Sequence, residues 1–154
     1  MKRRTFLRNT LAVSAAGAAL GTGLVAPGVA LADDEPVNPF KVGTLEEALK
    51  AAGAEGYEET DKVVVTAPDL AENAAVVPVE ISSELEGVTE IVILIANNPT
   101  PYAAKFAIGE GSDALVKCRF KMGESSDVIG IVKAGDKYYG AKKAVKVTKG
   151  GCGG

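Results

Sequence analysis

The sequence predicts an all-β protein: an antiparallel β-sandwich of about seven strands, with a short helix before it and a flexible arm after it. From about residue 62 onward, short runs rich in Val, Ile and Tyr alternate with polar residues, which is the pattern of strands with one buried face. Turn-forming residues separate these runs at intervals of about 8–12 residues, as in sandwiches. Residues 33–148 therefore form the predicted domain, whose length is usual for a single domain.

The first expected element is a short helix that begins after Thr44. Thr44 is a favourable N-cap, and Glu47 three residues later completes a capping box. Gly53 occupies the position where a left-handed residue commonly ends a helix. Apolar residues recur at helical spacing and predict one face that packs on a larger body. These residues are Leu45, Ala48, Leu49 and Ala52.

Three strands are expected in the first half of the sandwich, and residues 62–66 form the first of them. Residues 77–81 alternate apolar and polar side chains, and Pro78 among them predicts an edge strand because proline cannot donate to a sheet ladder. Residues 90–96 are apolar on both faces and rich in β-branched side chains. This last pattern is typical of a central strand that is buried on both sides.

The second half of the domain continues with strands joined by turns. Residues 97–101, Asn-Asn-Pro-Thr-Pro, predict a rigid turn. After this turn we expect strands at residues 102–108, 114–122, 127–133 and 137–148. The last of these is either one long strand or two short strands around Gly140.

The N-terminus predicts a cleavable export signal at residues 1–32. Its basic start contains Arg-Arg-x-Phe-Leu at residues 3–7, which resembles a twin-arginine signal. Residues 9–32 carry no charge and are long enough to span a bilayer. Glycines, a proline and the small-x-small sequence at residues 30–32 favour cleavage over a membrane anchor. We therefore expect a periplasmic protein, exported by the twin-arginine pathway, without a membrane anchor after cleavage.

Charge and composition exclude several classes of function. Removal of the four cations of the signal changes the formal net charge from −3 to −7. An acidic exported protein is a poor candidate for nucleic-acid binding. The chain has no His, and so it lacks the commonest general base and the commonest metal ligand. We expect no metal site, no catalytic residue and no nucleic-acid partner.

The feature that indicates function is the tail at residues 149–154, which reads Lys-Gly-Gly-Cys-Gly-Gly. Glycine has wide conformational freedom, so the tail is expected to form a flexible arm. Cys152 has two glycines on each side and no base beside it in sequence. An exposed thiol on such an arm suits transport between proteins better than local catalysis. We predict covalent substrate attachment at Cys152, on a swinging arm of Gly150, Gly151, Gly153 and Gly154.

Three other interpretations of Cys152 remain open: an incidental cysteine in a disordered end, an intermolecular disulfide, and a disulfide with Cys118. Cys118 lies in an alternating run that predicts an inward-facing core residue, so the two cysteines would not normally meet. An exposed free thiol is a liability in an oxidising compartment, which favours a reactive role. The alternative function is a thiol-disulfide redox or disulfide-linked interaction protein, although this chain lacks the usual C-x-x-C spacing.

Several lysines lie near the base of the tail, on a chain that is otherwise acidic. We expect Lys146 and Lys149 to attract an anionic substrate toward Cys152. For either lysine alone, the competing interpretation is an ordinary solvated side chain on a strand face.

The combination of features resembles the SoxY family, the sulfur-carrier subunits of bacterial thiosulfate oxidation. The resemblance rests on Gly-Gly-Cys-Gly-Gly at residues 150–154, behind the Arg-Arg-x-Phe-Leu signal and a small β domain. The turn Asn-Pro-Thr-Pro at residues 98–101 adds to it. It implies an immunoglobulin-like sandwich and a carrier, not an enzyme. It also implies that sulfur intermediates are bound covalently to Cys152, with no cofactor.

The resemblance also implies the partners. SoxY-like chains form a heterodimer with SoxZ, another small β-sandwich. The haem protein SoxAX joins thiosulfate to the arm's thiol, and the hydrolase SoxB releases sulfate. SoxCD oxidises the remaining persulfide sulfur where it is present, and SoxB then restores the free thiol.

Overall fold

The structure is a computed structural model that describes residues 38–148. The predicted signal at residues 1–32 and the predicted arm at residues 149–154 lie outside the described residues. The helices within this range are η1 (Pro39–Lys41), a 3-10 helix, and α1 (Leu45–Ala52). The strands are β1 (Glu58–Glu59), β2 (Val63–Thr66), β3 (Leu70–Ala71), β4 (Val77–Ser83), β5 (Val88–Ile95), β6 (Tyr102–Ala107), β7 (Leu115–Phe120), β8 (Ser126–Ala134) and β9 (Lys137–Val147).

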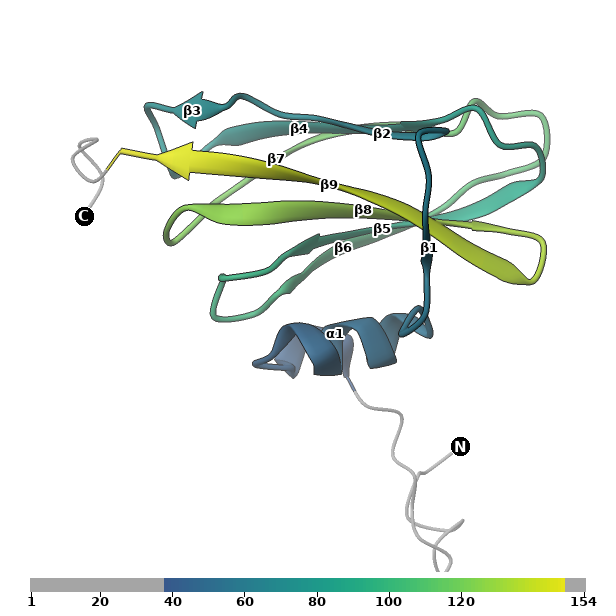
Figure 1. Ribbon diagram of the computed structural model, residues 1–154, viewed down its shortest axis with the longest axis horizontal. Coiled ribbons are helices and arrows are strands. Elements are labelled where there is room, and N and C mark those ends of the chain that lie inside the picture. Colours follow the sequence, from purple (N-terminus) through teal and green to yellow (C-terminus); the bar gives the residue numbers. More distant parts are fainter. Residues whose placement is uncertain (1–37, 149–154) are drawn as a thin grey trace, which may run out of the picture. The chain divides into compact units, whose positions relative to one another are not determined.

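The strands form two sheets that pack face to face (Figure 1). The larger sheet has the order β1-β9-β8-β5-β6, with β3 also paired to β9, and the smaller sheet has the order β2-β4-β7. All pairs are antiparallel except those of β1 and β3, which run parallel to β9. The predicted β-sandwich is confirmed. The described chain has nine strands instead of about seven, because the two-residue strands β1 and β3 are too short to show alternation.

Strand β5 is the centre of the core. Ile91 and Ile93 are fully buried between the two sheets. Val92 and Leu94 point to the opposite face, where they are also buried and belong to the cluster beneath α1. Side chains alternate along a strand, so a strand covered on both faces is apolar throughout. The prediction of a central strand at residues 90–96 is confirmed, since β5 lies between β8 and β6.

Helix α1 begins and ends where the sequence predicts. The backbone N–H of Glu47 donates to Thr44 Oγ1 at 3.2 Å, and the backbone N–H of Thr44 donates to the Glu47 carboxylate at 3.3 Å. Gly53 ends the helix with a φ of 69°, a conformation that glycine adopts without steric cost. Ala48 and Ala52 are buried against the larger sheet. The helix lies on the side of this sheet that faces away from β2 and β4 (Figure 1).

Strand β9 continues without a break through Gly140, which decides between the two alternatives for this segment. A Cβ atom at position 140 would lie 2.7 Å from the ring of Tyr57 and 2.9 Å from the carbonyl oxygen of Gly130. Glycine at this position therefore serves close packing and not a turn. As a result, one strand carries the chain along the whole larger sheet to the point where the predicted arm begins.

The prediction of an edge strand around Pro78 is wrong, since β4 lies between β2 and β7. The pairing of β4 with β2 ends at Glu80, however, and Pro78 has only Arg119 of β7 opposite it. The missing N–H of Pro78 thus removes no hydrogen bond to β2. Proline therefore indicates here that β4 has no strand partner beside Pro78 on the β2 side. That partner is missing because β2 is short.

Candidate functional site

The predicted attachment residue Cys152, the glycines of the arm and Lys149 lie outside the described residues. The structure describes the base of the arm instead, which is the end of β9 and the loops around it. Cys152 is the fourth residue after Thr148. An extended chain covers at most about 3.3–3.6 Å per residue, so the Cα atoms of Cys152 and Thr148 lie within roughly 14 Å of each other. The base therefore determines where the thiol can act.

One side of the base is held by β3. Leu70 and Ala71 pair in parallel with Lys146 and Val147. The backbone N–H of Lys146 donates to the carbonyl of Asp69 at 2.9 Å, and that of Thr148 donates to Ala71 at 3.2 Å. The Thr148 hydroxyl donates to the carbonyl of Glu72 at 3.3 Å. Residues 69–72 thus keep β9 extended up to its last described residue.

The other side of the base is held by a side chain. The pairing of β8 with β9 ends at Ser126 and Val145, so the next N–H on that side of β9, from Val147, has no strand partner. It donates to Ser125 Oγ at 3.0 Å. Ser125 therefore continues the ladder by one hydrogen bond beyond the end of β8.

The turn at residues 97–101 fixes the loop that carries Ser125. Asn97 Nδ2 donates to the carbonyl of Ser125 at 2.9 Å. The side chain of Asn98 donates to the carbonyl of Lys121 at 2.9 Å and accepts from the N–H of Gly123 at 3.0 Å. The sequence indicates this turn but not its contacts. Asparagine side chains before a proline are typical of a turn that they cap. The loop to which these two asparagines bind lies more than twenty residues away in the sequence, so the sequence does not indicate the contact.

The lysines of β9 differ in their charge partners. Lys142 Nζ lies 3.1 Å from the Glu59 carboxylate. Lys143 Nζ lies 2.7 Å from the Asp69 carboxylate, and its hydrogen bond and charge lower the pKa of Asp69. Lys146 is exposed and makes no ion pair with any residue in the range 38–148. Among Lys142, Lys143 and Lys146, Lys146 is therefore the one whose charge is not paired with a described carboxylate and remains available to an anion.

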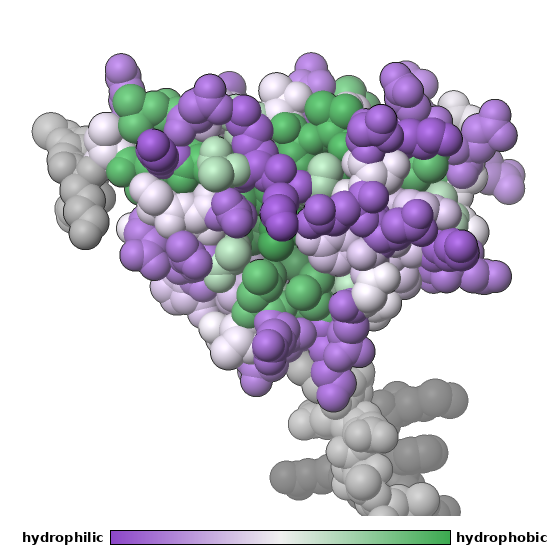
Figure 2. All heavy atoms as spheres, viewed as in Figure 1, coloured by the Kyte–Doolittle hydropathy of each residue, from purple (hydrophilic) through white to green (hydrophobic). Residues whose placement is uncertain are grey.

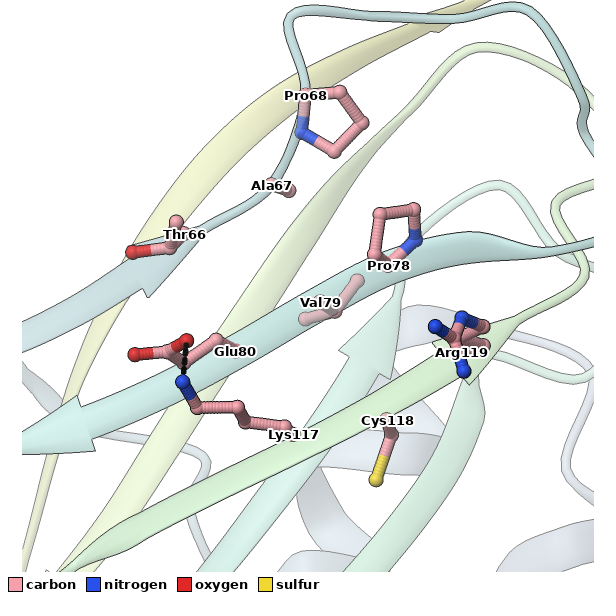
Figure 3. A pocket seen from close by; sticks show the side chains of 9 residues that line it. All are labelled: Thr66, Ala67, Pro68, Pro78, Val79, Glu80, Lys117, Cys118 and Arg119. Carbon is pink, nitrogen blue, oxygen red and sulfur yellow. Dashed lines mark ion pairs between the residues drawn. The ribbon is translucent and has the colours of Figure 1, made fainter.

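Cys118 lies on the inner face of β7, opposite Val79, as its alternating pattern predicts. It is only partly buried, because β7 is an edge strand of the smaller sheet. A groove of about 650 Å³ lies on the other face of this sheet, where the side chains of Glu80 and Lys117 point away from the Cys118 sulfur (Figure 3). The predicted direction of Cys118 is confirmed, whereas its predicted position in the closed core is wrong. Cys118 forms no disulfide with any other residue that the structure describes.

The described residues contain no group of three or more Cys, Asp or Glu side chains arranged to hold a metal ion. Over residues 38–148, no helix combines the length and the apolar character needed to cross a membrane. The base of the arm presents hydroxyl, amide and ammonium groups beside the exposed carboxylates of Asp69 and Glu72. The hydroxyl and amide groups hold the chain, and the ammonium group of Lys146 can attract an anion.

Comparison with known proteins relates this geometry to a family. A family model described as sulfur oxidation protein SoxY matches residues 48–152, a range that includes Cys152. Among solved structures, the sulfur carrier protein SoxY from Chlorobium limicola f thiosulfatophilum is 31% identical to this chain, with a TM-score of 0.63. The alignment covers 70% of this chain and 95% of that chain. It confirms the immunoglobulin-like form of the sandwich.

A second solved structure, superoxide reductase (neelaredoxin) from Ignicoccus hospitalis, has a TM-score of 0.51. It is 16% identical, and the alignment covers 68% of this chain and 93% of that chain. At this identity the likeness concerns the fold alone. A search of the curated proteins found no match.

Proposed function

Because this chain belongs to the SoxY family of sulfur oxidation proteins, we propose that it is a periplasmic carrier that holds thiosulfate-derived sulfur on Cys152. The observation that carries this proposal is the extent of the family match, which runs through the sandwich and ends at Cys152. The hydrogen-bonded base supports it, since Thr148 gives the arm a defined starting point.

In the proposed cycle, the thiol of Cys152 forms a disulfide bond with the outer sulfur of thiosulfate. The thiol loses its proton, and an electron pair passes to SoxAX, the haem protein that catalyses this step. Water then cleaves the bond between the sulfane sulfur and the sulfonate on SoxB. This hydrolysis releases sulfate and a proton and leaves a persulfide on Cys152.

The persulfide is the second intermediate that the arm carries. Where SoxCD is present, it takes electrons from the outer sulfur, which becomes a sulfonate with oxygen from water. A further hydrolysis on SoxB releases this group as sulfate and restores the thiol. The carrier holds and presents each intermediate, as part of a heterodimer with a SoxZ-like subunit, and its partners perform the chemistry.

Intact mass spectrometry of the protein from cells that oxidise thiosulfate tests the proposal. We expect thiosulfonate or sulfane adducts on the wild-type chain and on Cys118→Ser, and none on Cys152→Ser. The Cys118→Ser variant is the matched control, because it removes the chain's other thiol. If only free thiol or disulfide-linked dimer is present, the carrier function is wrong.

We propose that Lys146, together with Lys149, raises the local concentration of thiosulfate through its charge. The double variant Lys146→Glu/Lys149→Glu should load more slowly at low salt, and the difference should shrink at high salt because screening weakens exposed charges. Lys62→Glu is the control, since Lys62 precedes β2 at the opposite end of the sandwich. Equal loading rates at low salt would contradict this role.

A further inference from the structure

Strand β7 forms one edge of the smaller sheet, and one side of its backbone has no strand partner among residues 38–148. The backbone N–H of Ser83 donates to the carbonyl of Ala114 at 2.9 Å, so the carbonyl of the residue before β7 points toward β4. Backbone groups point to alternate sides along a strand. The N–H and C=O groups of Lys117 and Arg119 therefore point away from β4, and we call this side the open edge of β7.

The turn at residues 97–101 limits the open edge at one end. The carbonyl of Lys121 points to the same side as those of Lys117 and Arg119, and it accepts a hydrogen bond from Asn98 Nδ2 at 2.9 Å. The open edge therefore covers residues 115–119. At about 3.4 Å per residue, this length suits a strand of roughly five residues.

The two flanks of the sandwich differ in how they are closed. On one flank, β2 of the smaller sheet lies in sequence between β1 and β3, which both pair with β9 of the larger sheet. Figure 2 shows the molecule from the side of β9, where apolar side chains lie in patches among hydrophilic ones. The other flank ends in the edge strands β6 and β7. Phe106 of β6 and Val116 and Phe120 of β7 pack against the core between the sheets there, and all three are only partly buried.

Cations line the outer face of β7. Lys117 and Arg119 alternate with the inward side chains of this strand, and Lys121 directly follows it. Lys117 Nζ lies 2.8 Å from the carboxylate of Glu80, which is the only acidic residue on β2, β4 and β7. Neither Arg119 nor Lys121 makes an ion pair with any residue in the range 38–148. The open edge is therefore positively charged, on a chain whose formal net charge is −3.

The charge of the open edge selects its occupant. If the β7 strands of two copies paired, Lys117 and Arg119 of one copy would lie beside the same cations of the other, and like charges on paired strands are destabilising. A second copy therefore does not fit. Cations on an edge strand also protect it from unwanted pairing, but they do so only against neutral or cationic strands. An acidic strand gains attraction from the same side chains.

We propose that the open edge of β7 binds an extended acidic segment of another protein as an added strand, an inference that goes beyond the carrier function and does not depend on it. The segment alternates acidic and apolar residues. Its acidic side chains lie on the outer face, beside Lys117 and Arg119, and its apolar side chains cover Val116 and Phe120 on the inner face. Main-chain hydrogen bonds to the open edge supply affinity, and the alternation supplies specificity.

Amide hydrogen exchange measured by NMR tests the open edge. The full chain, purified without partner proteins, is titrated with the capped peptide Glu-Val-Glu-Val-Glu-Val. In the chain alone, the amides of Lys117 and Arg119 should exchange as fast as exposed amides, because they point away from β4. With the peptide at ten times its Kd, both amides should exchange about tenfold more slowly. The control peptide Lys-Val-Lys-Val-Lys-Val has the same pattern with the opposite charge and should leave both rates unchanged.

Two double variants test the role of charge. Arg119→Glu/Lys121→Glu should weaken binding of the acidic peptide at least tenfold. Lys50→Glu/Lys137→Glu is the matched control, since it makes the same change of charge on α1 and at the start of β9, and should keep the wild-type Kd within about twofold. If the first variant does not fold, Arg119→Gln/Lys121→Gln takes its place. The proposal is refuted if the acidic peptide leaves the amides of Lys117 and Arg119 unprotected, if the basic peptide protects them equally, or if both double variants bind alike.

Discussion

Removing the hydrogen bond from Val147 N–H to Ser125 Oγ would test how the base of the arm is held. Ser125→Ala removes the acceptor and leaves the backbone hydrogen bonds to β3 in place. Both the serine and its bond are exposed to solvent, so water can replace the lost partner in part. We expect local opening at Val147 and no loss of the sandwich.

The size of the effect follows from the energy of one exposed hydrogen bond. A net contribution of about 0.5–1.5 kcal/mol corresponds to roughly a twofold to tenfold change in an opening equilibrium. If Val147 and Thr148 detach, the reach of the arm grows by about 7 Å. Each detached residue must be ordered again when an enzyme binds the arm, and this ordering costs about 1–2 kcal/mol of backbone entropy per residue. We therefore expect slower loading of Cys152 in spite of the longer reach.

Hydrogen exchange measured by NMR is the assay. The amide of Val147 should lose protection about twofold to tenfold in Ser125→Ala, while the amide of Ile93 in the core keeps its protection. Ser112→Ala, in the loop between β6 and β7, is the control and should leave Val147 unchanged. Equal protection of Val147 in Ser125→Ala, or an equal loss of protection at Ile93, would contradict a local role for this hydrogen bond.

Three further predictions concern stability. Gly140→Ala should lower the free energy of unfolding by about 1–3 kcal/mol, because the added methyl overlaps its neighbours. Gly43→Ala has open space at its Cβ, and thermal melts should show a far smaller change. Thr44→Ala removes the cap of α1 and should cost about 1 kcal/mol in the same assay, whereas an unchanged melt would argue against the capping box. Lys143 lowers the pKa of Asp69 below its ordinary value of 3.8, so the stabilisation is complete above that value and is lost as pH falls through the lowered pKa. The small difference in melting temperature between wild type and Asp69→Asn should therefore vanish in strong acid, and a constant difference would contradict the pairing.

Features that depend on neighbours in the chain were predictable. The cap of α1 needs only Thr44 and Glu47, which interact across one turn. The central position of β5 follows from its apolar pattern, since only a strand covered on both faces is apolar throughout. Predictions failed where a distant segment decides the outcome. Pro78 lies on a central strand because β2 is too short to reach it, and Cys118 is partly exposed because β7 is an edge strand of the smaller sheet. The two alternatives around Gly140 stayed open in the sequence because its close contacts, Tyr57 and Gly130, lie on other segments.

The sandwich and the helix were predictable from the sequence, as was the choice of Cys152 as the candidate carrier residue, because each is expressed in a local pattern of side chains. The way in which the end of β9 is held, in contrast, depends on contacts between distant segments of the fold. Ser125 and Val147 are 22 residues apart, and Glu72 and Thr148 are 76 residues apart. A strand end takes its hydrogen-bond partners from whichever segments the packed sheets bring beside it. No local sequence pattern specifies these partners. The hydrogen bonds at the base of the arm can therefore form only when the two sheets are packed.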